Sequence, residues 1–416
     1  MNYLNLNTKP HIIVNKKIHT ITFERTYCLP YDKYDVFKVR ILTNLLTFTT
    51  KDYPLENEYN KEKTKRLIMN LSAEYRTRGN NLFFSFYLTV PKEGITESFN
   101  LDKAFELFVN SIFKPNVTNK AFDKKQFDRE VSIMNTDLDE SVNSFYSIVY
   151  EKCMKLYDDQ EVLGISLLDN RHILNELTPE DLYNYYLEII NSKSVNIIYG
   201  NTSKQRIIDL YKKYNLYEEC KFKIEKKYLT LLPKYTKLKE SNDHSDYNQS
   251  CLFYGYKVKD YTLEENRYLN LIGELLDGKE CRMLFNSLRI ENQLVYHYST
   301  GGTLYAGGFT IYVYLSKRNK DKAKEVIHAT LEKLKDKDFL KENIKKVVKG
   351  YEYELIYELD RNNTPYRDYC AELYQQLPGF KETKEFYENI DLDKFIAFLN
   401  RIQLDTILFI EGDKDA

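Results

Sequence analysis

The chain has 416 residues, a formal net charge of −1, 43% hydrophobic residues and 30% charged residues. This length exceeds one ordinary domain and suits two domains with separate cores. The balanced charge argues against nucleic acid or an anionic membrane as a partner, and no apolar run approaches the ~18 residues of a membrane helix.

The compartment is predicted from the N-terminus and the cysteines. The first residues, MNYLNLNTKPHIIVNKK, lack the apolar segment of a secretory signal. The six cysteines stand singly without a CxxC pair, which argues against a disulfide framework or a zinc knuckle. We therefore expect a cytoplasmic protein.

The first half starts with β-like segments and continues with helices and strands. HIIVNKK and HTITFERTY alternate in the way expected of a β-hairpin. In residues 101–113, apolar side chains recur at helical spacing, and Thr178-Pro179 is a plausible helix start. The expected elements are a hairpin at 11–27, helices at 35–50, 101–113, about 122–157 and 178–190, and strands at 81–90 and 194–201.

The second half repeats this order of elements. Its closing helix and the strand DTILFIEGD match the closing helix and the strand SVNIIYGN of the first half. A period this long indicates a duplicated domain, because the repeats of solenoids are far shorter. The expected elements are strands at 251–258, 294–300, 307–316 and 405–413, and helices at 266–278, 321–337, about 340–377 and 391–402.

These patterns predict an α+β fold of two homologous domains, each a mostly antiparallel sheet covered by helices. We expect an N-terminal domain at 1–220, a linker at 221–247 and a C-terminal domain at 248–416. The linker is predicted because residues 221–247 are rich in lysine and end in a polar cluster.

The most informative segment is RMLFNSLRIENQLVYHYST at 282–300. Arg289 precedes Tyr296 by seven residues, with Gln293 between them. This segment resembles the Arg/Tyr substrate-binding motif in the C-terminal domains of pitrilysin- and insulinase-like zinc peptidases, the M16 family. Chains of this length in that family carry two α+β domains, so the resemblance extends to the order of elements along nearly the whole chain.

The resemblance implies roles for several residues. Tyr296 would donate a hydrogen bond to the oxyanion of the tetrahedral intermediate, and Arg289 would hold substrate carbonyls. Gln293, Gly302 and Gly308 are further candidates for substrate binding, since glycine permits close approach of a peptide backbone.

Each of these residues also has a structural alternative. Arg289 could pair with Glu291, and Tyr296 could be an ordinary strand residue. Period-two alternation would put Leu294, Tyr296 and Tyr298 on one strand face and Val295, His297 and Ser299 on the other. The glycine pairs 301–302 and 307–308 are typical of a turn between strands, the interpretation we prefer.

The zinc-binding HxxEH motif of the family is absent, since no two of the six histidines are four residues apart. Asn44, Thr47 and Phe48 occupy the approximate positions of its His, Glu and His, and cannot form a zinc site together. On the later helix, we interpret Glu130 and Glu140 as solvated carboxylates. We therefore expect no metal in this chain.

The resemblance implies a non-catalytic, substrate-binding subunit of a heterodimeric zinc peptidase. A second M16-like chain that carries HxxEH would supply the zinc, and the substrate would be a peptide, such as a leader peptide or a bacteriocin-type precursor. The alternative is an M16-like scaffold or peptide-binding protein without a hydrolytic role, in which Arg289 and Tyr296 are dispensable.

Overall fold

The computed structural model describes residues 3–225, 235–303, 306–361, 364–370, 373 and 378–413. Within these ranges the chain forms two compact units. The first comprises Met1–Glu140 and Ile165–Thr230, and the second comprises Ser141–Gly164 and Leu231–Ala416. No helix of the described residues combines the length and the apolar character needed to cross a membrane.

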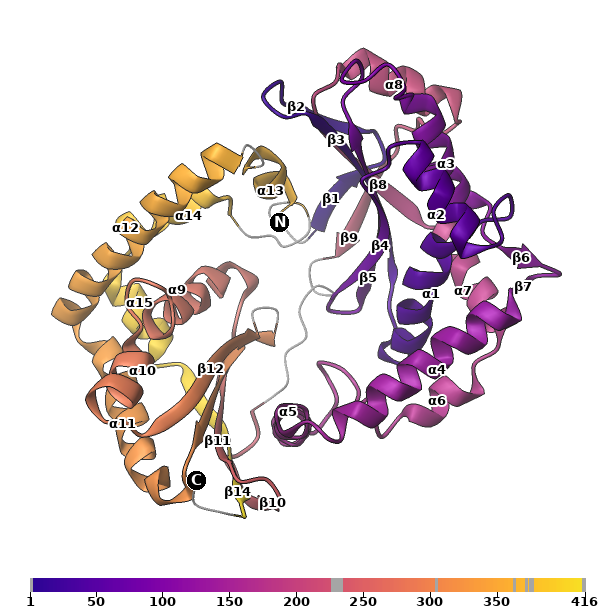
Figure 1. The fold of residues 1–416 in the computed structure, drawn as a ribbon. Coiled ribbons are helices and arrows are strands. Elements are labelled where there is room, and N and C mark those ends of the chain that lie inside the picture. The colour runs from indigo at the N-terminus through magenta and orange to yellow at the C-terminus, as the bar shows by residue number, and fades with distance from the viewer. Residues whose placement is uncertain are drawn as a thin grey trace. The chain divides into compact units, whose positions relative to one another are not determined.

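The first unit is built on a five-stranded sheet with the order β2-β8-β3-β5-β4, in which only β2 and β8 are parallel. Buried side chains of α1, α3, α7 and α8 pack with those of the sheet in one core, and Figure 1 shows the helices beside it. The elements of this unit are β1 (Tyr3–Asn7), β2 (His11–Val14), β3 (Thr20–Pro30), α1 (Val36–Phe48), α2 (Glu56–Lys65), β4 (Asn70–Arg78), β5 (Asn81–Pro91), α3 (Leu101–Phe113), β6 (Val117–Thr118), β7 (Ala121–Phe122), α4 (Lys124–Ser141), α6 (Arg171–Glu176), α7 (Pro179–Asn191), β8 (Lys193–Gly200), α8 (Lys204–Lys213) and β9 (Lys221–Glu225).

The second unit repeats this sheet. Its strand order is β10-β14-β11-β13-β12, and again only the first pair is parallel. The equal order and direction of the strands confirm the predicted α+β duplication. The elements are α5 (Phe145–Tyr157), β10 (Lys239–Ser245), β11 (Ser250–Val258), α9 (Asn266–Leu276), α10 (Met283–Phe285), β12 (Val295–Thr303), β13 (Gly308–Leu315), α11 (Lys320–Glu332), α12 (Lys337–Arg361), α13 (Thr364–Cys370), α14 (Phe380–Glu388), α15 (Leu392–Leu399) and β14 (Ile402–Gly412).

Local sequence signals were reliable for several helices. The residues Leu101, Phe105, Phe108 and Ile112 are at most 1% exposed on α3, as their spacing predicts. Helix α7 begins after Thr178. The Thr178 hydroxyl accepts a hydrogen bond from the backbone N–H of Asp181, and the Asp181 carboxylate accepts one from the backbone N–H of Thr178. This reciprocal cap satisfies two N–H groups that the first helical turn leaves without a partner.

The predicted hairpin at 11–27 is wrong. Strand β2 pairs in parallel with β8, and β8 lies between β2 and β3 in the sheet. The strand that separates them comes from almost two hundred residues later in the chain, a pairing that alternation within residues 11–27 does not reveal.

The domain boundaries also differ from those predicted. Residues 141–164 cluster with the second unit, so the helix expected over 122–157 is two helices, α4 and α5. Helix α5 begins as a separate helix after Ser144, whose side chain accepts a hydrogen bond from the backbone N–H of Ser147 and so caps the new first turn. Both ends of the predicted linker are paired strands, since β9 pairs with β1 and β10 pairs with β14. Residues 226–234 of the predicted linker lie outside the described residues.

Helix α5 covers the face of the second sheet opposite to that covered by α9, α11, α12 and α15 (Figure 1). Its Val149 and Cys153 are fully buried against Cys251 and Phe253 of β11. The second sheet is therefore apolar on both faces, which explains why all nine residues of β11 are buried.

Candidate functional site

The segment that carries Arg289 lies between α9 and β12 in the second unit. It begins with the short helix α10 and continues as a π-helical turn over Asn286–Glu291. Met283, Leu284 and Leu288 anchor it in the core, where they are at most 7% exposed. A π-helical turn is uncommon and often occurs at functional sites. It was not predicted from the sequence.

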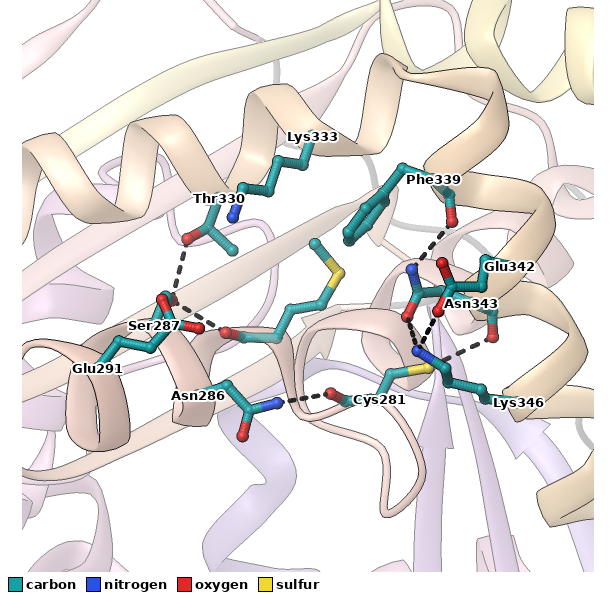
Figure 2. Close-up of a pocket in the computed structure, with 11 residues that line it drawn as sticks. Cys281, Asn286, Ser287, Glu291, Thr330, Lys333, Phe339, Glu342, Asn343 and Lys346 are labelled. Atoms are coloured by element: carbon teal, nitrogen blue, oxygen red, sulfur yellow. Dashed lines mark hydrogen bonds and ion pairs between the residues drawn. The ribbon is translucent and has the colours of Figure 1, made fainter.

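The inner side of this turn is held by hydrogen bonds (Figure 2). The Ser287 hydroxyl donates to the Met283 carbonyl at 2.9 Å and lies 3.0 Å from the Thr330 hydroxyl of α11. The Asn286 side chain donates to the Cys281 carbonyl at 3.2 Å. These bonds fix the buried side of the turn, so that its other side can present Arg289 to solvent.

A cavity of about 220 Å³ lies on that inner side, between the π-helical turn, α11 and α12. Its charged lining has both signs: Glu291, Lys333, Glu342 and Lys346. Burial raises the pKa of the Cys281 thiol at its wall to about 11, so this thiol is protonated at neutral pH. Neither Arg289 nor Tyr296 is among the described residues that line the cavity.

Arg289 is exposed and reaches back to the start of β12. Its Nη1 donates to the main-chain carbonyl of Tyr296 at 3.1 Å, and its Cζ lies 6.0 Å from the centroid of the Phe285 ring. Among the described residues it forms no ion pair, so the alternative pairing with Glu291 is not observed. The seven-residue spacing thus corresponds to a direct contact between the two motif residues.

Tyr296 lies at an irregularity of the edge strand β12. Val295 pairs with Leu315 and His297 with Tyr314, so that Tyr296 is an extra residue in its strand. Such a β-bulge reverses the side-chain alternation on one side of it. The predicted division of faces is therefore wrong for Val295, which packs in the same core as Tyr298. It is right for His297, which stacks on Tyr314, a residue of the core on the opposite sheet face.

The bulge leaves the Tyr296 side chain 42% exposed, far more than its neighbour Val295 at 8%. Bulges are common next to active sites because they re-aim a side chain without ending the strand. The sequence did not indicate this bulge, because one inserted residue in a short strand leaves alternation on each side of it.

The other predicted site residues lie in the turn before β12 and in the strands β12 and β13. Gln293 is exposed and has a left-handed backbone (φ 52°) in the turn before β12. Gly302 is exposed on the edge strand, whereas Gly308 is buried in the interior strand β13. Gly307 has φ 59° and lies beside the Tyr261 ring. The preferred interpretation of the two glycine pairs as a turn therefore fits Gly307 alone, since Gly301 and Gly302 lie in β12 and Gly308 begins β13.

The residues that the resemblance aligns with the zinc-binding motif lie on α1 of the first unit. On α1, Asn44 donates through Nδ2 to Oε2 of Glu130 on α4 at 2.7 Å. The Thr47 hydroxyl donates to the Thr43 carbonyl at 2.9 Å, and the Arg129 guanidinium lies 5.8 Å from the centroid of the Phe48 ring. An amide, a hydroxyl engaged by its own helix and a phenyl ring do not fit zinc.

The interpretation of Glu130 as a solvated carboxylate is wrong. Its side chain is 5% exposed, and its spacing from Phe127, Met134 and Leu138 puts all four on the buried side of α4. That spacing was visible in the sequence and could have identified it. Glu140, by contrast, is exposed as expected.

One other group of described residues has ligand types suited to a metal. His244, Asp246 and Asp413 are all exposed, and their ligand atoms lie within 4.8 Å of one another. The His244 Nε2 is 2.8 Å from Asp413 Oδ1. Exposed acidic groups of this kind are common without a metal, and this group contains none of the predicted site residues.

Comparison with known proteins gives the following matches. Residues 176–351, which include Arg289 and Tyr296, match the family model described as the Peptidase M16 inactive domain. Comparison with curated proteins finds no match.

Solved structures share the fold over the whole chain. A conserved protein from Enterococcus faecalis V583 has a TM-score of 0.81 and 17% identity, with 100% of each chain covered. A protease from Helicobacter pylori has a TM-score of 0.71 and 16% identity, covering 97% of this chain and 96% of the other. A peptidase M16 inactive domain from Pseudomonas fluorescens has a TM-score of 0.68 and 11% identity, covering 96% and 95%. Identities this low establish similarity of fold.

Proposed function

We propose that this chain, whose residues 176–351 match the model of the M16 inactive domain, is the non-catalytic, substrate-holding subunit of a two-chain zinc peptidase. A second M16-like chain would carry HxxEH and supply the zinc with its water. This chain would supply Arg289 and Tyr296 to the partner's site.

The observation that carries the proposal is the contrast between the two candidate sites. In the first unit, Asn44, which the resemblance aligns with a histidine of the zinc-binding motif, donates a hydrogen bond to Glu130. In the second unit, a π-helical turn and a β-bulge present Arg289 and Tyr296 at the surface.

The chemistry of the two residues suits a peptide in the act of hydrolysis. Arg289 already donates to a main-chain carbonyl, and a bound peptide offers acceptors of the same kind. The Tyr296 hydroxyl can donate to the oxygen that becomes negative when the scissile carbonyl is attacked, and such a donor stabilises the transition state more than the ground state.

The proposal includes a class of substrate and a cellular compartment. The substrate would be a peptide, including leader peptides and bacteriocin-type precursors, and both subunits would act in the cytoplasm. Gln293 and Gly302, exposed beside Tyr296 and farther along the same edge strand, would contact the peptide backbone.

The test is reconstitution with an HxxEH-bearing chain encoded nearby in the genome, assayed on quenched-fluorescence peptides with zinc supplied. We expect activity in the mixture alone, and a loss of about 100-fold in kcat for Tyr296→Phe, the cost of removing one oxyanion donor. Tyr353→Phe, a change of the same kind at a 54% exposed position on α12, is the matched control. Association is followed by size-exclusion chromatography.

Two results would contradict the proposal. Hydrolysis by this chain alone would show that it has a catalytic centre of its own. Full activity of Tyr296→Phe in a stable complex would show that the tyrosine does not act on the substrate.

One observation favours the second candidate, a scaffold without a hydrolytic role. The bond from Arg289 to the Tyr296 carbonyl also braces the start of β12, a purely structural use of the arginine. In that case, Arg289→Ala would lower the stability of the second unit, and the reconstituted pair would keep its activity.

A further inference from the structure

A second arginine stands at the start of the segment that carries Arg289. Arg282 is exposed and has a left-handed backbone, φ 46° and ψ 41°, immediately before α10. A residue with a Cβ rarely adopts this conformation, whereas glycine adopts it readily. Strained backbone of this kind clusters at active sites and ligand-binding segments.

Both arginines lie against one aromatic ring. The Cζ of Arg282 is 5.2 Å from the centroid of Phe285, and the Cζ of Arg289 is 6.0 Å from the same centroid. Arg282 is three residues before Phe285 and Arg289 four residues after it. Stacking on a ring orients a guanidinium plane and restricts its motion, which prepares it for a planar anion.

Among the described residues, neither arginine forms an ion pair. The neighbouring carboxylate of Asp277 accepts hydrogen bonds from the hydroxyls of Tyr298 and Thr300. The surface around Phe285 thus carries two oriented cations whose charge no carboxylate of the described residues neutralises by direct contact.

We propose that Arg282 is a specificity-determining residue, which binds a carboxylate of the peptide whose backbone Arg289 holds. This rests on the proposed function of Arg289. A guanidinium matches a carboxylate through two parallel N–H···O bonds. Because both guanidinium groups flank one ring, and an extended peptide rises ~3.3 Å per residue, the carboxylate lies within about three residues of the carbonyl at Arg289.

The carboxylate can come from an acidic side chain or from the C-terminus of the peptide, and three pools of fluorescein-labelled random octapeptides distinguish these sources. One pool has a fixed glutamate and an amidated C-terminus. The second has glutamine in place of the glutamate, and the third has this glutamine and a free C-terminal carboxylate. Binding to the full chain, without a partner, is measured by fluorescence anisotropy at low salt.

We expect the glutamate pool or the free-carboxylate pool to bind about fivefold more tightly than the amidated glutamine pool, the upper end for an exposed ion pair. Whichever pool gains identifies the source. The preference disappears in Arg282→Gly and is retained in part by Arg282→Lys. Arg282→Gly also relieves the backbone strain, so its melting temperature should equal or exceed that of the parent.

Lys120→Gly is the matched control, because Lys120 is also an exposed cation with a left-handed backbone, φ 63°. It removes the same charge and the same strain in the first unit, and should keep the preference. Equal binding of all pools by the parent, or a preference that survives in Arg282→Gly, would overturn the role of Arg282 and leave the proposed function standing. Failure of every pool to bind would overturn both.

Discussion

Replacing Asn44 by alanine should destabilise the first unit through the carboxylate that it leaves behind. The Asn44 amide donates to Glu130 at 2.7 Å and joins α1 to α4. The Glu130 side chain is 5% exposed, and the cationic Nε of Arg129 lies 3.7 Å from its Oε1. Arg129 also pairs with Glu56 at 2.7 Å, so it compensates only in part.

The expected loss follows from the burial of that carboxylate. A hydrogen bond to a charged group contributes about 1.5–3 kcal/mol, and a buried acceptor left without a partner costs a similar amount. Asn44 itself is only half-buried, so a water molecule can replace part of its contact. We therefore expect Asn44→Ala to lower the free energy of unfolding of the first unit by about 2 kcal/mol.

The assay must report on the first unit alone. Urea unfolding followed by circular dichroism gives the total change, and hydrogen exchange measured by mass spectrometry assigns it to peptides from α1 and α4. Exchange in α9 and α11 of the second unit serves as the internal control and should not change.

A double-mutant cycle decides whether the carboxylate causes the loss. In a Glu130→Gln background the acceptor is neutral, so Asn44→Ala should cost about 1 kcal/mol, as for an ordinary hydrogen bond. An equal loss in both backgrounds, or a loss below about 0.5 kcal/mol in the parent, would refute the view that the buried carboxylate makes this link between α1 and α4 costly to break.

Two further predictions concern the attachment of α5 to the second sheet. In Gly255→Ala, the new methyl group would lie 2.3 Å from a ring carbon of Tyr157, so α5 should lose protection from hydrogen exchange and become sensitive to limited proteolysis. Unchanged protection would mean that the ring can move aside. In Asp405→Asn, Lys257 no longer has the carboxylate that lies 3.0 Å from its amine. The free energy of unfolding should fall by about 3 kcal/mol near neutral pH. Burial lowers the pKa of the Lys257 amine, because the folded state disfavours its charged form. The difference in free energy of unfolding between parent and variant should therefore shrink as the pH rises toward the ordinary lysine pKa. A difference that does not vary with pH would contradict this explanation.

The sequence by itself determined the features that depend on local spacing. The apolar period of α3, the cap of α7 and the order of elements in each half identified two homologous α+β units. The resemblance of residues 282–300 to the M16 Arg/Tyr motif indicated the segment of interest, and the absence of HxxEH can be read directly from the chain.

The tertiary structure alone decided which segments become neighbours. Strand β8 separates β2 from β3, α5 joins the second unit rather than the first, and Glu130 is buried beside Asn44. Side-chain periodicity records which face of an element is covered, but not which distant segment covers it. The bulge at Tyr296 and the π-helical turn before it arise for the same reason, since pairing with β13 and packing against α11 set the local backbone there.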